Sequence, residues 1–338
     1  MDLAVSIILI VVFIISLVKL IIYHYKRWDL YKAGNKIPGP RPVLPIIGNS
    51  HLFMVHKEKF VEFAHLWLGT GLFTAPAKKW KVHRKLIMPT FHSEILESFF
   101  DTINKKSEIL VRMMEPEINK IEFDILDYIS HCVLDIVCAT PRKKAFLDLL
   151  IELSDKGTLT EKEIYEEVDS MMVAANDTTS TMTSFVVFML ANFPNISPLK
   201  ETMRLFPVAP FAMRNLADDL DIGGGYTLPK GSIVVLAFLK LQHSADFWDN
   251  PLSFDPDRFS SEQAVKRHTE AFFPFSAGLR HCPGSKYAMM SMKIIISNLL
   301  KNYVLIKDRH VNIEDIGIKP DIIIRASNPL TLKIKRKF

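Results

Sequence analysis

The chain has 338 residues, of which 49% are hydrophobic, and this is ample for one sizeable core or two smaller ones. Its formal net charge is +5, but the basic residues gather after an N-terminal apolar run and at the C-terminus, not in the stripe across folded elements that is typical of nucleic-acid binding, so we expect no nucleic-acid partner. Three cysteines, Cys132, Cys138 and Cys282, are too few for a disulfide framework in a chain of this length, which favours a reducing compartment.

The first 25 residues have the composition of a membrane anchor. From Leu3 to Tyr23 the chain is almost continuously apolar, which is long enough to span a bilayer. The alternative is a cleavable signal peptide, but Asp2 stands where a basic start is expected and no small-residue cleavage site follows. Lys26 and Arg27 come after the span, so we expect a single transmembrane helix with the bulk of the chain on the cytoplasmic side.

A basic and proline-rich spacer is predicted over residues 26–50. Four prolines lie between Pro38 and Pro45, and proline fixes φ and forbids a helix interior. This stretch is therefore expected to be stiff and extended. The folded domain is predicted to occupy residues 51–338.

Helices dominate the first part of this domain. Apolar residues recur at helical intervals from Trp80 to about Met114, with Pro89 ending one helix and beginning another. Cys132 and Cys138 lie in a further apolar stretch of helical spacing and are interpreted as small buried hydrophobes. Thr160 and Glu163 form a predicted capping box. It opens a periodic run that reaches residue 193, which predicts a helix of about 50 Å.

Strand signals come later in the chain. A second helix is predicted over about residues 198–206, then a glycine-rich hairpin over 222–231 and an apolar run over 233–239. A helix from Ser285 to about Tyr303 precedes late strands near residues 322–326 and 330–334. The predicted fold class is mainly α with a small β portion.

The strongest chemical signal surrounds Cys282. A lone cysteine is usually a buried small hydrophobe, and a redox or nucleophilic thiol is a further alternative. Here, however, Gly278 and Gly284 let backbone approach a flat ligand, Arg280 supplies a nearby cation, and a predicted helix begins directly afterwards with its dipole favouring a thiolate. Zinc is disfavoured because no further ligand stands at finger-like spacing.

The segment from Phe275 to Gly284 resembles the haem-binding loop of the cytochrome P450 superfamily at every fixed position of that motif. The resemblance implies a shortened cytochrome P450 fold with a haem (iron protoporphyrin IX) cofactor, and it is nearest to microsomal enzymes of the family-4 clan. It implies that Cys282 is the axial thiolate ligand of the iron, which favours O–O cleavage. The haem-binding residues that it implies in this loop are Phe275, Gly278, Arg280 and Gly284.

An acid and two threonines interrupt the apolar long helix at Asp177–Thr178–Thr179. One interpretation is structural, with Thr178 bonding back to the carbonyl of Ala174. The resemblance implies instead that Asp177 and Thr178 deliver protons to bound dioxygen. Ala174 stands where many family-4 enzymes carry a glutamate that esterifies the haem, so no covalent attachment is expected there.

Two further sets of charged residues match the family. Trp80 and Arg84 lie one helical turn apart, as in any amphipathic helix, but the resemblance implies that they bind a haem propionate together with Arg280 and Arg214. Glu201 and Arg204 stand at i and i+3, which alone indicates a surface salt bridge worth under about 1 kcal/mol. The resemblance adds Arg258 and implies a structural Glu–Arg–Arg lock beneath the haem loop.

The chain is shorter than the resemblance leads one to expect. Helices of the family are missing between Cys138 and Arg142 and between Asp177 and Glu201, and the strands and substrate-loop helix expected before Leu66 leave little trace. Segments 171–175 and 208–213 remain as candidate pocket lining. Two hypotheses therefore stand side by side: a haem monooxygenase, and an inactive relative that binds haem or partners.

The resemblance also implies partners and a location. A monooxygenase of this kind inserts one atom of dioxygen into an apolar small-molecule substrate with electrons from NADPH, which reach it through a flavoprotein reductase. The expected location is the endoplasmic reticulum membrane, with the domain on the cytoplasmic side.

Overall fold

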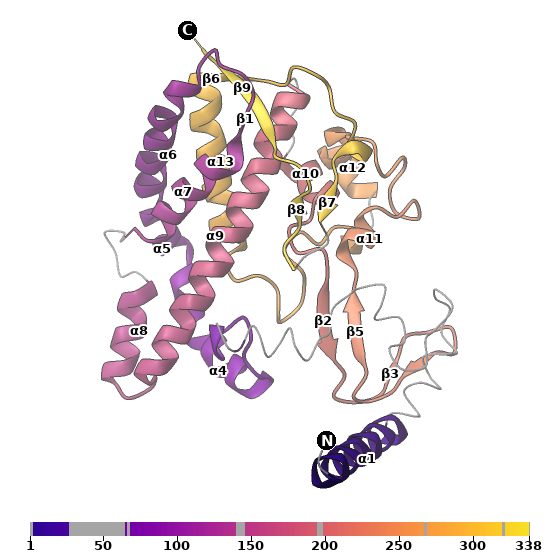
Figure 1. Cartoon of the computed structure of the whole chain (residues 1–338). Helices are drawn as coiled ribbons and strands as arrows, with labels where there is room; N and C mark the ends of the chain where they lie inside the picture. Colours follow the sequence, from indigo (N-terminus) through magenta and orange to yellow (C-terminus); the bar gives the residue numbers. More distant parts are fainter. Residues whose placement is uncertain are drawn as a thin grey trace. The chain divides into compact units, whose positions relative to one another are not determined.

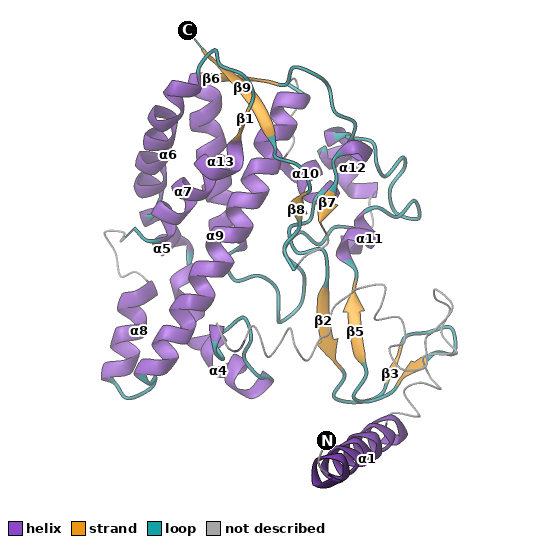
Figure 2. Ribbon diagram, in the orientation of Figure 1, coloured by secondary structure: helices purple, strands orange, loops and turns teal. Residues whose placement is uncertain are grey.

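The computed structural model describes residues 3–26, 65, 68–139, 146–194, 199–266, 269–319 and 322–337. The contacts divide the chain into two compact units. The first comprises Met1–Lys57 and Met213–Leu236, and the second comprises Glu58–Ala212 and Ala237–Phe338. Helix is the dominant secondary structure and strands are few and short, which confirms the predicted class (Figure 2). Apart from Lys26, the predicted spacer over 26–50 lies outside the described residues.

The first unit contains one long helix and two short hairpins. Helix α1 (Leu3–Lys26) covers the predicted anchor. Within the residues whose side chains are described, the structure contains no helix that is both long and apolar enough to cross a membrane. Strand β2 (Ala212–Asn215) pairs with β5 (Ile233–Leu236), and β3 (Leu220–Asp221) pairs with β4 (Thr227–Leu228). The predicted glycine-rich turn closes the second hairpin, where Gly223 to Gly225 all have positive φ.

Most helices belong to the second unit (Figure 1). Pro89 interrupts the helical pattern as predicted, because a 3-10 turn over Met88–Phe91 separates two α-helices there. The α-helices are α4 (Ala77–Ile87), α5 (Ser93–Ser98), α6 (Phe100–Met114), α7 (Ile125–Val137), α8 (Phe146–Asp155), α9 (Glu161–Asn192), α10 (Leu199–Leu205), α11 (Phe238–Gln242), α12 (Ser261–Lys266) and α13 (Ser285–Asn302).

Helix α9 is the predicted long helix, with 32 residues. Its capping box is formed in full: Glu163 N–H donates to the Thr160 hydroxyl at 3.3 Å, and Thr160 N–H donates to the Glu163 carboxylate at 3.0 Å. The helix ends just before Phe193, which confirms the end predicted from Pro194. A helix of this length reaches from the α4 end of the unit into its core.

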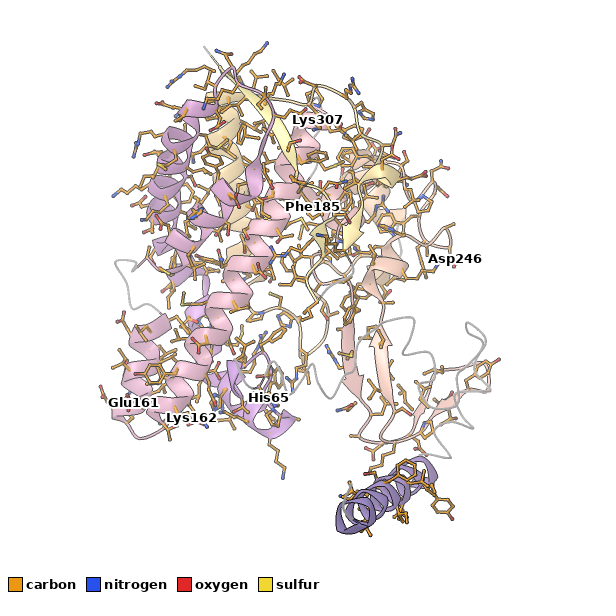
Figure 3. The ribbon with its side chains drawn as sticks, in the orientation of Figure 1. His65, Glu161, Lys162, Phe185, Asp246 and Lys307 are labelled. Carbon is orange, nitrogen blue, oxygen red and sulfur yellow. The ribbon has the colours of Figure 1, made fainter. Side chains whose placement is uncertain are left out.

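The core of the second unit is built around the C-terminal half of α9. Helices α7 and α13 pack against α9, and α6 packs against both α7 and α13 (Figure 1). Every residue of α9 from Thr179 to Asn192 is buried, and Phe185 stacks on Phe206 with ring centroids 4.7 Å apart. Figure 3 labels Phe185 on the buried half of α9. Burial of aromatic rings at this density contributes most of the stability of such a core.

Short strands complete the second unit. Strand β9 (Thr331–Arg336) pairs with β1 (Phe123–Asp124) and β6 (Tyr303–Ile306), and β7 (Ile318–Lys319) pairs with β8 (Arg325–Ala326). The β structure predicted for the apolar run over 233–239 was wrong at its end, because β5 ends at Leu236 and α11 begins at Phe238.

Cys132 in α7 and Cys138 at its C-cap differ in their surroundings. Cys132 is buried as predicted, and burial raises the pKa of its thiol to about 12. The same prediction was wrong for Cys138, which is exposed because it caps the C-terminus of α7 beyond the packed face.

Candidate functional site

Cys282 lies in a tight loop directly before α13. Its N–H donates to the carbonyl of Phe275 at 2.9 Å, and His281 N–H donates to the carbonyl of Gly278 at 3.1 Å. Gly278 has φ +73°, and the space where a Cβ would stand is open. A residue with a side chain is strained at this φ, so glycine suits the turn. The loop therefore presents a half-buried sulfur at the start of a helix.

Burial and two neighbours, Gly284 and Arg84, affect the protonation of the Cys282 sulfur. Burial has the largest effect and raises the pKa of the thiol, whereas the backbone N–H of Gly284 and the positive charge of Arg84 lower it only in part. Gly284 is the N-cap residue of α13, so the partial positive charge of that helix terminus acts in the same direction. A positive ion bound to the sulfur would add to these contributions and keep it as a thiolate.

Helix α4 places an aromatic ring and a guanidinium beside the cysteine loop. The Arg280 guanidinium lies over the Trp80 ring at 4.0 Å from its centroid. Arg84 is buried, and its Nη2 lies 3.5 Å from Nε2 of His281. Trp80, Arg84 and Arg280 thus gather around one loop.

Arg214, the third predicted haem-binding cation, belongs to the first unit. It is on β2 in the first unit, where its guanidinium donates to the carbonyl of Met213 at 2.9 Å. Trp80, Arg84 and Arg280 belong to the second unit. Its role in haem binding remains an expectation from the sequence.

The acid and the threonine of α9 lie where the helix changes from half-buried to buried. The Thr178 hydroxyl donates to the carbonyl of Ala174 at 2.6 Å, which is the backbone bond predicted as the structural interpretation. The Asp177 carboxylate forms an ion pair with Arg325 of β8. The side-chain oxygen of Asn176 is buried without a hydrogen-bond partner among the described residues. We call these three polar residues of α9, Asn176, Asp177 and Thr178, the polar notch.

The Glu201–Arg204 pair is buried, so the interpretation as a surface salt bridge is wrong. Neither side chain is exposed, and two hydrogen bonds of 2.8 and 2.7 Å join them. Arg258 adds its Nε at 3.5 Å from the Glu201 carboxylate. The three residues meet as the resemblance implies.

Several residues of these networks escaped the sequence reasoning. Gln242 is buried, donates to the carbonyls of Met203 and Arg204, and accepts from Phe273 N–H at 2.9 Å. It thereby joins α10 to the segment leading to the cysteine loop. Glu167 is also buried and accepts from His83, next to Arg84, with 2.7 Å between the atoms. No local signal marks a glutamine or a glutamate as buried, so these partners could not have been found by pattern.

The residues present fit a haem. A half-buried thiol at a helix N-terminus can ligate iron, and the indole N–H and two guanidinium groups around the loop suit the carboxylates of its propionates. The α9 segment over residues 171–178 is half-buried or exposed throughout, although the rest of the helix beyond it is fully buried. This uncovered segment is the kind of surface that a bound group would cover.

A mainly helical domain with such a cysteine loop and an acid–threonine pair on a long helix is typical of haem-thiolate proteins. A model of the family described as Cytochrome P450 matches residues 48–141, 139–198 and 197–334, which is most of the chain. The chain belongs to the cytochrome P450 family, whose cofactor is haem and whose members are haem-thiolate monooxygenases.

Named relatives are members of cytochrome P450 family 4. Cytochrome P450 4V2 of Homo sapiens is 26% identical over 444 aligned positions, which cover 93% of this chain and 83% of the relative. Cytochrome P450 4c21 of Blattella germanica is 27% identical and covers 94% of this chain and 87% of the relative. Cytochrome P450 4c3 of Drosophila melanogaster is 27% identical, covering 87% and 78%.

The comparisons locate the shortening. The aligned stretch of 444 positions is longer than the whole chain of 338 residues, so the relative contains segments that this chain lacks. The three matches to the family model join near residues 139–141 and 197–198. The sequence predicts missing helices at these same places, and both joins reach into parts of the chain outside the described residues.

Proposed function

We propose that the chain is a membrane-anchored haem-thiolate monooxygenase that inserts one atom of dioxygen into an apolar organic substrate, with electrons from NADPH delivered by a flavoprotein reductase. The observation that carries the proposal is the Cys282 loop, in which a half-buried sulfur, a helix N-terminus and the Arg84 guanidinium meet. Gly284 and Arg84 favour an anionic sulfur, and ligation of a positive iron ion would oppose the burial that raises the pKa of this thiol. The half-buried segment 171–178, with its methionine and alanine side chains, supports an apolar substrate.

The site residues divide into those that would hold the iron and those that would hold the haem propionates. Cys282 would ligate the iron, in a loop shaped by Phe275, Gly278 and Gly284. The propionates would be held by Trp80, Arg84, Arg280 and, from the first unit, Arg214. The haem supplies the redox chemistry that activates dioxygen.

The polar notch of α9 would deliver protons from solvent to the bound ligand. Thr178 holds a hydroxyl proton that is now donated to Ala174, and rotation of its side chain would aim that proton at a ligand beside the helix. Asp177 is 33% exposed, so its carboxylate can exchange protons with solvent and resupply the hydroxyl. The pair would thus act as a general-acid relay from solvent to the bound oxygen.

The proposed domain division follows the sequence: an anchor over residues 1–25, a spacer over 26–50 and a shortened monooxygenase domain over 51–338. The apolar run of α1 and the basic residues after it support anchoring in the endoplasmic reticulum membrane with the domain on the cytoplasmic side. Transmembrane insertion is tested by resistance of the protein to alkaline extraction from microsomes. Extraction of the full chain by alkali would contradict the anchor.

One observation favours a second candidate, an inactive relative that binds haem or a partner without turnover. The chain lacks segments of its relatives at two internal joins, and one join directly precedes the helix pair that leads into the notch. Segments that wall a pocket in the relatives can be among those lost. The first candidate turns over substrate and the second does not, although both belong to the same family.

The reduced, carbon-monoxide difference spectrum of the purified full chain tests the proposal. A thiolate-ligated haem gives a red-shifted Soret band, and Cys282→Ala should abolish it, whereas the control Cys138→Ala removes an exposed thiol and should retain it. NADPH consumption with added reductase then separates enzyme from inactive relative. A wild-type chain that takes up no haem overturns both forms of haem binding.

A further inference from the structure

Asp177 has a partner that the sequence did not indicate. Its carboxylate forms an ion pair with the guanidinium of Arg325, a residue 148 positions further along the chain. Among the described residues no other cation forms an ion pair with this carboxylate. The proposed proton relay therefore starts from an acid that is already engaged.

The backbone around Arg325 is held in place by the core. Arg325 lies opposite Lys319 in the pairing of β8 with β7. The preceding residue, Ile324, is fully buried, and its N–H donates to the carbonyl of Val208 at 2.9 Å. These backbone contacts hold Arg325 where its side chain reaches Asp177 on α9.

The neighbours of Asp177 on α9 leave the carboxylate to Arg325. The Thr178 hydroxyl donates to the carbonyl of Ala174 at 2.6 Å, so its proton does not go to Asp177. The Arg325 side chain is 39% exposed and that of Asp177 33%, so water reaches the pair. Guanidinium groups stay charged at any physiological pH, and their planar N–H groups are well suited to orient a carboxylate.

We propose that Arg325 is a positioning residue for Asp177: it fixes the carboxylate at the edge of the α9 notch and releases it when the carboxylate takes a proton from water. In the cycle, Asp177 gains a proton from solvent, passes it to the Thr178 side of the notch and returns to Arg325 as a carboxylate. The guanidinium keeps all its protons throughout. This inference rests on the proposed monooxygenase function and adds a residue to it.

The test uses the full haem-loaded chain with Arg325→Leu, which removes the charge, and Arg325→Lys, which keeps it. Lys319→Leu is the matched control, because it removes an exposed cation from the opposite strand position. The carbon-monoxide band reports haem binding. The fraction of NADPH electrons recovered in product, with the remainder in hydrogen peroxide, reports proton delivery.

Arg325→Leu should keep the band of the wild type and lower the fraction of electrons in product by about tenfold, since a single general-acid group contributes more than this. Arg325→Lys should recover most of the loss, and Lys319→Leu should match the wild type. A merely structural role for Arg325 would weaken haem binding and leave the fraction of electrons in product unchanged.

A second readout needs no haem. Unfolding midpoints of the unloaded chain are compared for Arg325→Leu, Asp177→Asn and the double variant. The double variant should lose no more than the larger single change, because both remove the same pair. Additive losses of the unfolding midpoint in the double variant would overturn the role of Arg325 but not the proposed function. A normal carbon-monoxide band with unchanged product yield in Arg325→Leu would do the same. A wild-type chain without the band would instead overturn the proposed function and, with it, the role of Arg325 in proton delivery.

Discussion

The guanidinium of Arg204 donates two hydrogen bonds to the carboxylate of Glu201, and neither side chain is exposed to solvent. The same guanidinium donates to the carbonyl of Gln242 at 2.7 Å and lies over the ring of Trp248 at 4.9 Å from its centroid. Every charged atom of this pair therefore depends on protein partners. Such a pair adds little over an apolar replacement, but it is costly to break.

Glu201→Gln should destabilise the chain by about 3–5 kcal/mol, because Arg204 is left as an uncompensated buried charge. Urea unfolding followed by far-ultraviolet circular dichroism measures the loss. The control is Glu152→Gln, since Glu152 pairs with Lys156 across an exposed helix face, and its loss should stay under about 1 kcal/mol. Equal losses in the two variants would contradict the buried-pair argument.

The sequence predicted features that are set by local pattern. Thr160 and Glu163 predicted the start of α9, and Pro194 predicted its end. Both predictions were possible because caps and prolines act on residues only a few positions away. The turn at Gly278 and the helix after Gly284 were predictable for the same reason. The family motif placed Cys282 in that loop, and the structure forms the loop as expected.

Features that depend on distant segments were beyond such reasoning. An i, i+3 pair such as Glu201 and Arg204 has the same spacing on a surface and in a core, and only the packing of other segments decides its burial. Asp177 meets Arg325 because a two-residue strand carries the arginine beside α9. Neither relationship leaves a mark in the local sequence.

Arg84→Leu is expected to weaken haem retention by about 10- to 100-fold, which corresponds to the loss of one charged hydrogen bond. Arg84 is buried next to the cysteine loop, whereas the neighbouring Lys85 is exposed. Transfer of haem to apomyoglobin, followed by absorbance, gives the rate of loss. Lys85→Leu should retain haem like the wild type. If the two variants lose haem at the same rate, Arg84 is not a propionate ligand.

The capping box of α9 makes stability depend on pH in the acid range. The N–H of Thr160 lowers the pKa of Glu163 to about 2 against the opposing effect of burial, with further help from the Thr160 hydroxyl and Lys79. Because the pKa is lower in the folded chain than the ordinary value of 4.5, the ionised Glu163 stabilises the fold above about pH 4.5. This contribution is lost as the pH falls towards 2.

Glu163→Gln should therefore be less stable than the wild type by about 1 kcal/mol at pH 7, with a difference that shrinks between pH 4.5 and 2. Unfolding midpoints measured across that range check the trend. Glu161→Gln, at an exposed position of the same first turn, serves as the control and should show a smaller change. A difference that is constant with pH would contradict the role given to the ionised carboxylate.

Gly71 lies where the turn before α4 meets the first turns of α9. A Cβ at this position would stand 2.2 Å from the carbonyl oxygen of Glu166 and 2.3 Å from the hydroxyl oxygen of Ser170. The first of these atoms is helix backbone and cannot swing aside, so the turn itself has to move. Gly71→Ala should therefore cost about 1–3 kcal/mol, as overpacking does in a close-packed interior.

Displacement of this turn should also reach the site. Leu72 N–H donates to the buried carboxylate of Glu167 at 2.9 Å, and the same carboxylate bonds to His83 beside Arg84. Gly71→Ala is therefore expected to lower haem retention as well as the unfolding midpoint. Gly157→Ala is the control, because a Cβ there meets nothing within 4 Å and only the φ of +67° is strained. It should cost about 1–2 kcal/mol and leave haem retention unchanged. Equal haem loss in both variants would show that the turn does not support α4.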